Sequence, residues 1–156
     1  MSGKPGKEEG KDLLLTLYYE GGVGGLFDAV DEQFLGDEFE ARFCERVLAA
    51  DPGYVEALGL LGNLYTKGGE YAKGLELDLR LLRLRPRSPR AHYNAGCSYA
   101  LMGRAEDALE ELSRAVEFGF RDADHMLADD DLASVREHPR FRELVELARK
   151  PAVAPG

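Results

Sequence analysis

Two stretches of similar sequence, 58-LGLLGNLY-65 and 92-HYNAGCSY-99, decide the expected fold. They begin 34 residues apart, and in each a glycine is followed three residues later by a tyrosine. The matched positions recur at intervals of three and four residues, which is the spacing of one face of a helix. A fixed period of this length is typical of proteins that stack copies of one small helical unit.

The match continues through the rest of each unit. Gly69 aligns with Gly103, at places where a helix is expected to end. An apolar helical pattern follows each of these glycines. The sequence therefore predicts two units, 55–88 and 89–122, each made of two helices joined by a glycine turn.

These features resemble the tetratricopeptide repeat (TPR) family over residues 51–122. The resemblance implies an all-α fold, an α-α superhelix formed as a short solenoid of helical hairpins. It also implies that the first helix of each unit lines a concave groove that binds a peptide or another protein. The sequence departs from the family pattern at three positions: His92 replaces a large apolar residue, Asp78 an aromatic residue and Phe120 the closing proline.

Outside the two units the repeat pattern weakens. A solenoid needs capping elements, because its end repeat otherwise exposes an apolar face. We expect Asp131 to begin a short capping helix as its N-cap and Pro139 to begin the last helix. The predicted division is a disordered tail at 1–11, a degenerate N-terminal repeat at 12–51, TPR 1 at 55–88, TPR 2 at 89–122, capping helices at 123–150 and a second disordered tail at 151–156. Leu13–Gly25 fits either a short helix or an extended arm.

Composition limits the class of protein. The 156 residues are 44% hydrophobic and 31% charged, as in a globular domain. The net charge of −9 disfavours nucleic-acid binding. No apolar run is long enough for a membrane span, and two cysteines form no disulfide framework. We therefore expect a cytoplasmic protein with no nucleic-acid and no membrane partner. The stretch 119–141 resembles the C-terminal closure of some bacterial repeat proteins, which implies a protein of bacterial type.

The resemblance implies a groove lined by outward-facing residues of the two first helices. Asn63 and Asn94 match two asparagines that some chaperone-binding members of the family use against a peptide's C-terminal carboxylate. Gly59, Asp124 and Ala128 stand where that clamp has basic residues, so a chaperone-tail clamp is not expected. The two asparagines either hold a peptide backbone or simply face the solvent. The predicted groove residues are Glu56, Leu60, Asn63, Lys67, Arg90, Tyr93, Asn94, Cys97 and Leu101.

A basic turn closes the first unit. Residues 51–90 carry 7 Lys/Arg and 5 Asp/Glu within an otherwise acidic chain. The arginines form either a docking surface for an acidic partner or a solvated face that complements a helix C-terminus. They are Arg80, Arg83, Arg85 and Arg87, with Arg90 following.

Three other motifs contain residue types that can carry chemistry. Gly21–Gly25 lacks the residues of a phosphate-binding loop. His125 with Asp129–Asp131 offers ligands for a divalent cation, or forms an acidic loop with a helix cap. Cys97 has no positioned base and orienting group in the sequence pattern. We therefore predict no catalytic residue, no metal and no cofactor, and expect that the protein is not an enzyme.

Asp78 is unusual because it falls on the apolar side of its helix. A carboxylate placed there is costly unless it finds hydrogen-bond donors. We expect Asp78 to pair with His92 or with a nearby amide; the alternative is that its side chain turns to solvent.

The expected function is that of a non-catalytic scaffold or adaptor, which binds a peptide or partner protein in the concave groove. One alternative is a self-associating module, a homodimer formed through the apolar segment Leu13–Tyr19. The other is a metal-binding protein that uses His125 and Asp129–Asp131.

Overall fold

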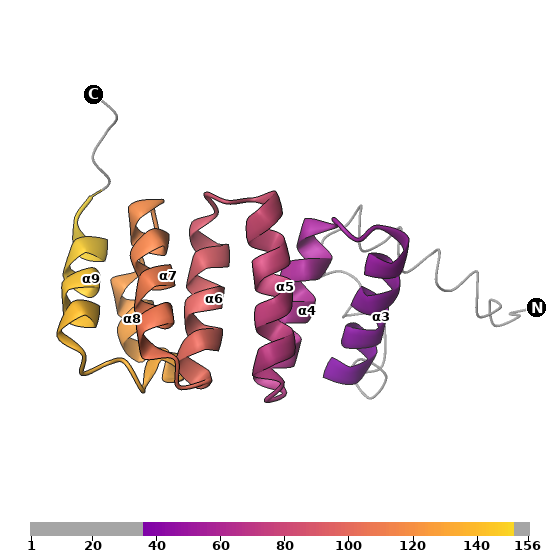
Figure 1. The fold of residues 1–156 in the computed structure, drawn as a ribbon, viewed down its shortest axis with the longest axis horizontal. Coiled ribbons are helices and arrows are strands. Elements are labelled where there is room, and N and C mark those ends of the chain that lie inside the picture. The colour runs from indigo at the N-terminus through magenta and orange to yellow at the C-terminus, as the bar shows by residue number, and fades with distance from the viewer. Residues whose placement is uncertain (1–35, 152–156) are drawn as a thin grey trace, which may run out of the picture. The chain divides into compact units, whose positions relative to one another are not determined.

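The computed structural model describes residues 36–151, and within this range every regular element is a helix (Figure 1). The predicted all-α fold is confirmed. The elements are α3 (Asp37–Ala50), α4 (Val55–Lys67), α5 (Tyr71–Leu84), α6 (Pro89–Leu101), α7 (Ala105–Glu117), α8 (Ala123–Ala128), the 3₁₀ turn η2 (Asp130–Leu132) and α9 (Pro139–Arg149).

Several predictions lie outside the described residues. They concern the tail at 1–11, the segment Leu13–Gly25 with its glycine run, and the proposed self-association segment Leu13–Tyr19. The chain divides into two units between Glu40 and Ala41, and α4 to α9 all belong to the second. None of the described helices is both long and apolar enough to cross a membrane.

The helices pack as successive hairpins. α4 packs against α5 and α6 against α7, while α5 contacts α6 and so joins the two hairpins. Each hairpin turn contains a glycine in the left-handed region, Gly69 with φ 84° and Gly103 with φ 75°. Residues with a β-carbon rarely adopt this conformation, so glycine is needed where each first helix ends.

Helix-interior glycines set the close approach of each pair. A β-carbon on Gly62 would lie 2.9 Å from Oδ1 of Asp78, and one on Gly74 would lie 3.0 Å from the Gly62 carbonyl oxygen. In the second hairpin, a β-carbon on Gly96 would lie 2.9 Å from Cγ of Leu112. These distances are shorter than ordinary van der Waals contact, so the two helices of each pair approach closely only because these positions lack side chains.

The capping segment completes the core of the second hairpin. α9 packs against α7 and α8, and η2 packs against α6. The largest fully buried side chains of this cluster come from both parts: Leu109 and Leu112 from the hairpin, and Met126, Leu132 and Phe141 from the cap. The cap therefore covers the apolar face that the last repeat would otherwise expose.

The expected helix with Asp131 as its N-cap is wrong. The capping residue is Asp129, whose Oδ1 accepts a hydrogen bond of 3.0 Å from the backbone N–H of Asp131. This contact caps only the three-residue turn η2, and the next α-helix begins at Pro139 as expected. The carboxylate of Asp131 is thereby left without a capping role.

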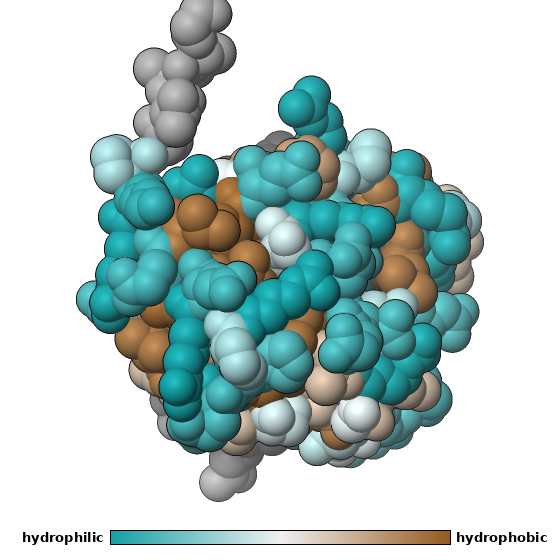
Figure 2. All heavy atoms as spheres, turned by 60° about the vertical axis from the view of Figure 1, so that its left-hand side comes forward, coloured by the Kyte–Doolittle hydropathy of each residue, from teal (hydrophilic) through white to brown (hydrophobic). Residues whose placement is uncertain are grey.

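Figure 2 shows a mostly hydrophilic surface that includes small apolar areas. Leu127 of α8 and Leu147 of α9 are two large apolar side chains of the capping segment that are exposed. Exposed apolar residues of this kind are ordinary on a folded protein.

Candidate functional site

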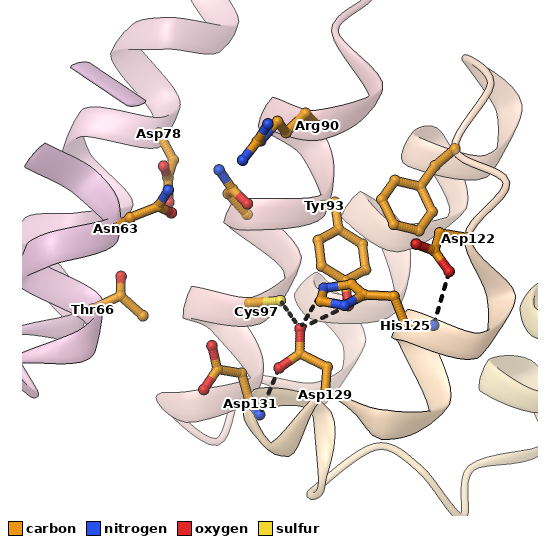
Figure 3. Close-up of a pocket in the computed structure, with 12 residues that line it drawn as sticks. Asn63, Thr66, Asp78, Arg90, Tyr93, Cys97, Asp122, His125, Asp129 and Asp131 are labelled. Atoms are coloured by element: carbon orange, nitrogen blue, oxygen red, sulfur yellow. Dashed lines mark hydrogen bonds and ion pairs between the residues drawn. The ribbon is translucent and has the colours of Figure 1, made fainter. Parts of the chain in front are cut away.

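A cavity of about 550 Å³ is lined by side chains of α4, α5 and α6 and of the capping segment. A second cavity of about 390 Å³ shares Asn63, Arg90 and Asn94 with it. We call the two together the groove. The residues that line the larger cavity are Asn63, Thr66, Asp78, Arg90, Tyr93, Asn94, Cys97, Phe120, Asp122, His125, Asp129 and Asp131 (Figure 3).

Most of the predicted groove residues lie along these two cavities. Asn63 and Asn94 line both, as does the exposed Arg90. Lys67 and Leu101 line neither. The remaining predicted residues divide between them: Glu56 and Leu60 line the smaller cavity, and Tyr93 and Cys97 the larger one.

Tyr93 forms a wall of the groove and is only 4% exposed. Its ring stacks on Phe120 with centroids 4.3 Å apart, and its hydroxyl donates a 2.8 Å hydrogen bond to Oδ2 of Asp129. The pKa of the Tyr93 hydroxyl is raised, mainly because the side chain is buried. We expected Tyr93 to face outward. Its side chain is buried instead, because the capping segment folds back over it.

The groove is acidic beside Cys97. Ligand-type atoms of Cys97, Asp129 and Asp131 all lie within 4.8 Å of one another. Nε2 of His125 lies 3.5 Å from Oδ2 of Asp129. Burial, followed by the charges of Asp129 and Asp131, raises the pKa of the Cys97 thiol. The thiol is therefore held in its neutral form, the opposite of an activated nucleophile.

We expected Asp78 to pair with His92 or with a nearby amide. Within residues 36–151 neither pairing is present, and the side chain does not turn to solvent either. Its side chain is 1% exposed, and its Oδ2 accepts a 3.2 Å hydrogen bond from the hydroxyl of Ser98. Oδ1 has no hydrogen-bond partner among the described residues. Burial raises the pKa of this carboxyl from 3.8 to about 7, and the Ser98 hydrogen bond opposes that shift.

His92 has different partners because it faces the second hairpin. Its Nδ1 lies 2.6 Å from Oε2 of Glu111, and its Nε2 lies 2.8 Å from the carbonyl oxygen of Pro86. A carbonyl only accepts, so Nε2 donates. His92 thus ties α6 to α7 and to the turn before α6, and it takes no part in the groove.

The arginines of the basic turn have mixed roles. Arg80 donates a 2.8 Å hydrogen bond to the carbonyl oxygen of Pro52, and the Arg87 guanidinium lies 5.6 Å from the Phe118 ring centroid. Arg83 and Arg85 are exposed. Two of the arginines therefore contact neighbouring elements, and a docking role for this turn stays a prediction.

The sequence pattern missed Thr66, Phe120 and Asp122 as lining residues. Thr66 lies one turn beyond Asn63 on α4, so helical spacing could have included it. Phe120 and Asp122 reach the groove only because the chain after α7 returns across α6. No feature of the sequence predicted this path of the chain after α7.

Known proteins share this arrangement of helices. The chain is similar to MamA, whose crystal structure superposes with a TM-score of 0.61 at 26% identity over 72% of this chain and 66% of that one. A second structure, MamA MSR-1 C2, gives a TM-score of 0.56 at 17% identity over 90% of this chain and 92% of that one. The chain has a TPR-type fold. The predicted solenoid of helical hairpins is thereby confirmed.

Sequence comparison adds less. No family model matches the chain. A chloroplastic protein of Arabidopsis thaliana is 27% identical over 88 residues, which are 54% of this chain. The chain spans only 26% of that protein.

Proposed function

We propose that this protein is a non-catalytic interaction module that binds an extended peptide segment of a partner protein in the groove. The strongest support is the placement of two asparagines, Asn63 on α4 and Asn94 on α6. Each of them lines both cavities of the groove. Amide side chains offer a donor and an acceptor each, which is what a peptide backbone requires. The TPR-type fold supports the same kind of role, since repeat solenoids use concave surfaces for binding.

The chemistry of the groove favours binding over catalysis. A nucleophile needs a lowered pKa or an adjacent base, whereas burial raises the pKa of Cys97. His92 and His125 have other contacts: His92 bonds Glu111 and Pro86, and Nε2 of His125 lies 3.5 Å from Oδ2 of Asp129. Among the described residues we find no nucleophile with a base and an orienting group.

Affinity capture from a lysate of the source organism tests the proposal. The baits are the wild type, the groove variant Asn63→Ala/Asn94→Ala, and a control variant Glu117→Ala/Glu143→Ala, whose changes lie on α7 and α9 and line neither cavity of the groove. All baits must first have equal helicity and equal melting temperature. The proposal expects a protein that the wild type and the control retain and the groove variant loses. Equal retention by all three baits would contradict it.

A Tyr93 variant is a poor probe of binding. Its ring and hydroxyl hold Phe120 and Asp129, so replacement by a charged residue would disturb the wall of the groove together with any contact to a partner. The asparagine pair avoids this problem, because neither side chain has a hydrogen-bond partner among residues 36–151.

A further inference from the structure

Two arginines line the smaller cavity of the groove. The side chains of Arg85 and Arg90 are exposed, and neither has a hydrogen bond, an ion pair or a ring contact in the described part of the chain. Arg85 ends α5, where a cation complements the helix dipole. Arg90 lies in the first turn of α6, where the same dipole disfavours a cation. Helix stability therefore accounts for Arg85 at most and leaves Arg90 without a structural role.

The Arg90 side chain points into the groove. Figure 3 shows its guanidinium extending from α6 into the space toward the first hairpin. Asn63 and Asn94 line the same two cavities as Arg90 does. A guanidinium carries only donors, and a carboxylate can accept two of them at once in a bidentate contact. Arg90 is therefore placed to bind a carboxylate that enters the groove.

The walls of the smaller cavity favour such a contact. Leu60, Leu81 and Ala91 line it beside the two arginines. Apolar walls displace water, so opposite charges attract more strongly there than on an open surface. Glu56 also lines this cavity, but within residues 36–151 it forms an ion pair with neither arginine. Two cations thus share the cavity with one acid, and its formal charge is positive.

We infer that the smaller cavity takes the side-chain carboxylate of an aspartate or glutamate in the bound peptide, with Arg90 as its main contact and Arg85 as the second. The inference rests on the proposed peptide groove and specifies an acidic residue in its ligand. Asn63 and Asn94 would hold the peptide backbone next to that residue, since they line the same cavity.

The distribution of charge limits how acidic the peptide can be. The capping segment brings three aspartates and one histidine to the larger cavity, so an acidic side chain is repelled there. The net charge of −9 also opposes the approach of a strongly acidic ligand. We therefore expect one acidic residue, bound at the Arg90 end, and not an acidic run along the whole groove.

Selection from a library of random dodecapeptides tests the inference. Each peptide is displayed with its C-terminus fused to the carrier, so a terminal carboxylate cannot serve as the anion. The wild type is the bait, and groove-dependent peptides are those that Asn63→Ala/Asn94→Ala fails to bind. Each of these is synthesised with an amidated C-terminus, both as selected and with its acidic residue changed to the matching amide.

Both forms of each peptide are titrated against the wild type, Arg90→Gln and the control Arg83→Gln. Arg83 is an exposed arginine of α5 that lines neither cavity, so the control removes an equal charge from outside the groove. Neither Arg83 nor Arg90 has a side-chain partner among the described residues, so both variants should keep the wild-type melting temperature.

The inference expects groove-dependent peptides that share an aspartate or glutamate at one position. Changing that residue to its amide lowers affinity roughly tenfold for the wild type and for Arg83→Gln, and by no more than about twofold for Arg90→Gln. An equal loss in Arg90→Gln and the wild type, or groove-dependent peptides without a shared acidic residue, would overturn the inference and leave the proposed function standing. The absence of any groove-dependent peptide would overturn both.

A reversal of charge gives a result that a change in stability cannot imitate. Arg90→Glu should bind a selected peptide more tightly once its shared acidic residue is replaced by lysine, because the attraction is then restored with opposite signs. The wild type should prefer the selected form. A preference of Arg90→Glu for the selected, acidic form would overturn the inference.

Discussion

The hydroxyl of Tyr93 donates a 2.8 Å hydrogen bond to Oδ2 of Asp129, and so joins the second repeat to the capping segment across 36 residues of sequence. The ring of Tyr93 stacks on Phe120 at the start of the same segment. The wall of the groove and the attachment of the cap therefore depend on one side chain.

Tyr93→Phe is expected to destabilise the protein by about 1.5 kcal/mol, because it removes a hydrogen bond to a carboxylate and keeps the ring. Urea unfolding followed by circular dichroism measures the change. Tyr99→Phe is the matched control, since no described residue hydrogen-bonds the Tyr99 hydroxyl. Equal effects of the two substitutions would show that the bond to Asp129 adds nothing.

Two glycine substitutions are expected to act in opposite directions. A β-carbon on Gly96 would lie 2.9 Å from Cγ of Leu112, so Gly96→Ala should destabilise by about 2 kcal/mol through overpacking. On Gly59 the nearest atom would be 3.9 Å away, so Gly59→Ala should stabilise by about 0.5 kcal/mol through helix propensity. Thermal unfolding measures both. Stabilisation by Gly96→Ala would contradict the close packing of α6 against α7.

The buried carboxyl of Asp78 should make stability depend on pH. Its pKa is about 7 in the folded protein against 3.8 ordinarily, so the unfolded state releases the proton first as pH rises. The wild type should therefore lose on the order of 4 kcal/mol relative to Asp78→Asn between pH 4 and pH 8. Unfolding free energies of both proteins across this range measure the difference. A difference that stays constant with pH would mean that Asp78 is ionised in the folded state.

Replacing His92 alone should destabilise the protein more than replacing both His92 and Glu111. His92→Ala removes the imidazole partner of the buried Glu111 carboxylate, which then keeps only the half-exposed Arg114 at 3.3 Å, and should cost about 3 kcal/mol. His92→Leu/Glu111→Leu removes both polar groups and should recover most of that loss. Denaturant midpoints of the single and double variants measure this. A double variant less stable than His92→Ala would indicate that the pair itself is strongly stabilising.

Local sequence signals predicted the hairpins well, because the decisive contacts lie within one unit. Gly69 and Gly103 mark turns through their own backbone conformation, and Gly62 and Gly96 mark close approach of neighbouring helices. Asn63, Asn94 and Arg90 followed from the TPR resemblance, which implies that outward-facing positions of the first helices line the groove.

The rest of the site depends on contacts between distant segments. Asp129 reaches Tyr93 from 36 residues away, and Phe120 covers a ring that helical spacing alone would leave outward-facing. The partners of Asp78 and His92 also depended on the packing of three helices: each had more than one polar neighbour within reach, and spacing alone could not choose between them.

Mapping of backbone amide chemical shifts tests the central claim most directly. Uniformly ¹⁵N-labelled wild type is titrated with a peptide from the protein that the wild type captures and the groove variant loses, and the Asn63→Ala/Asn94→Ala variant is the control. The account predicts shifts concentrated at Asn63, Arg90, Asn94 and the turn around Asp129, and their loss in the variant. Shifts confined to α5, α7 or α9, or shifts unchanged in the variant, would contradict a peptide-binding groove.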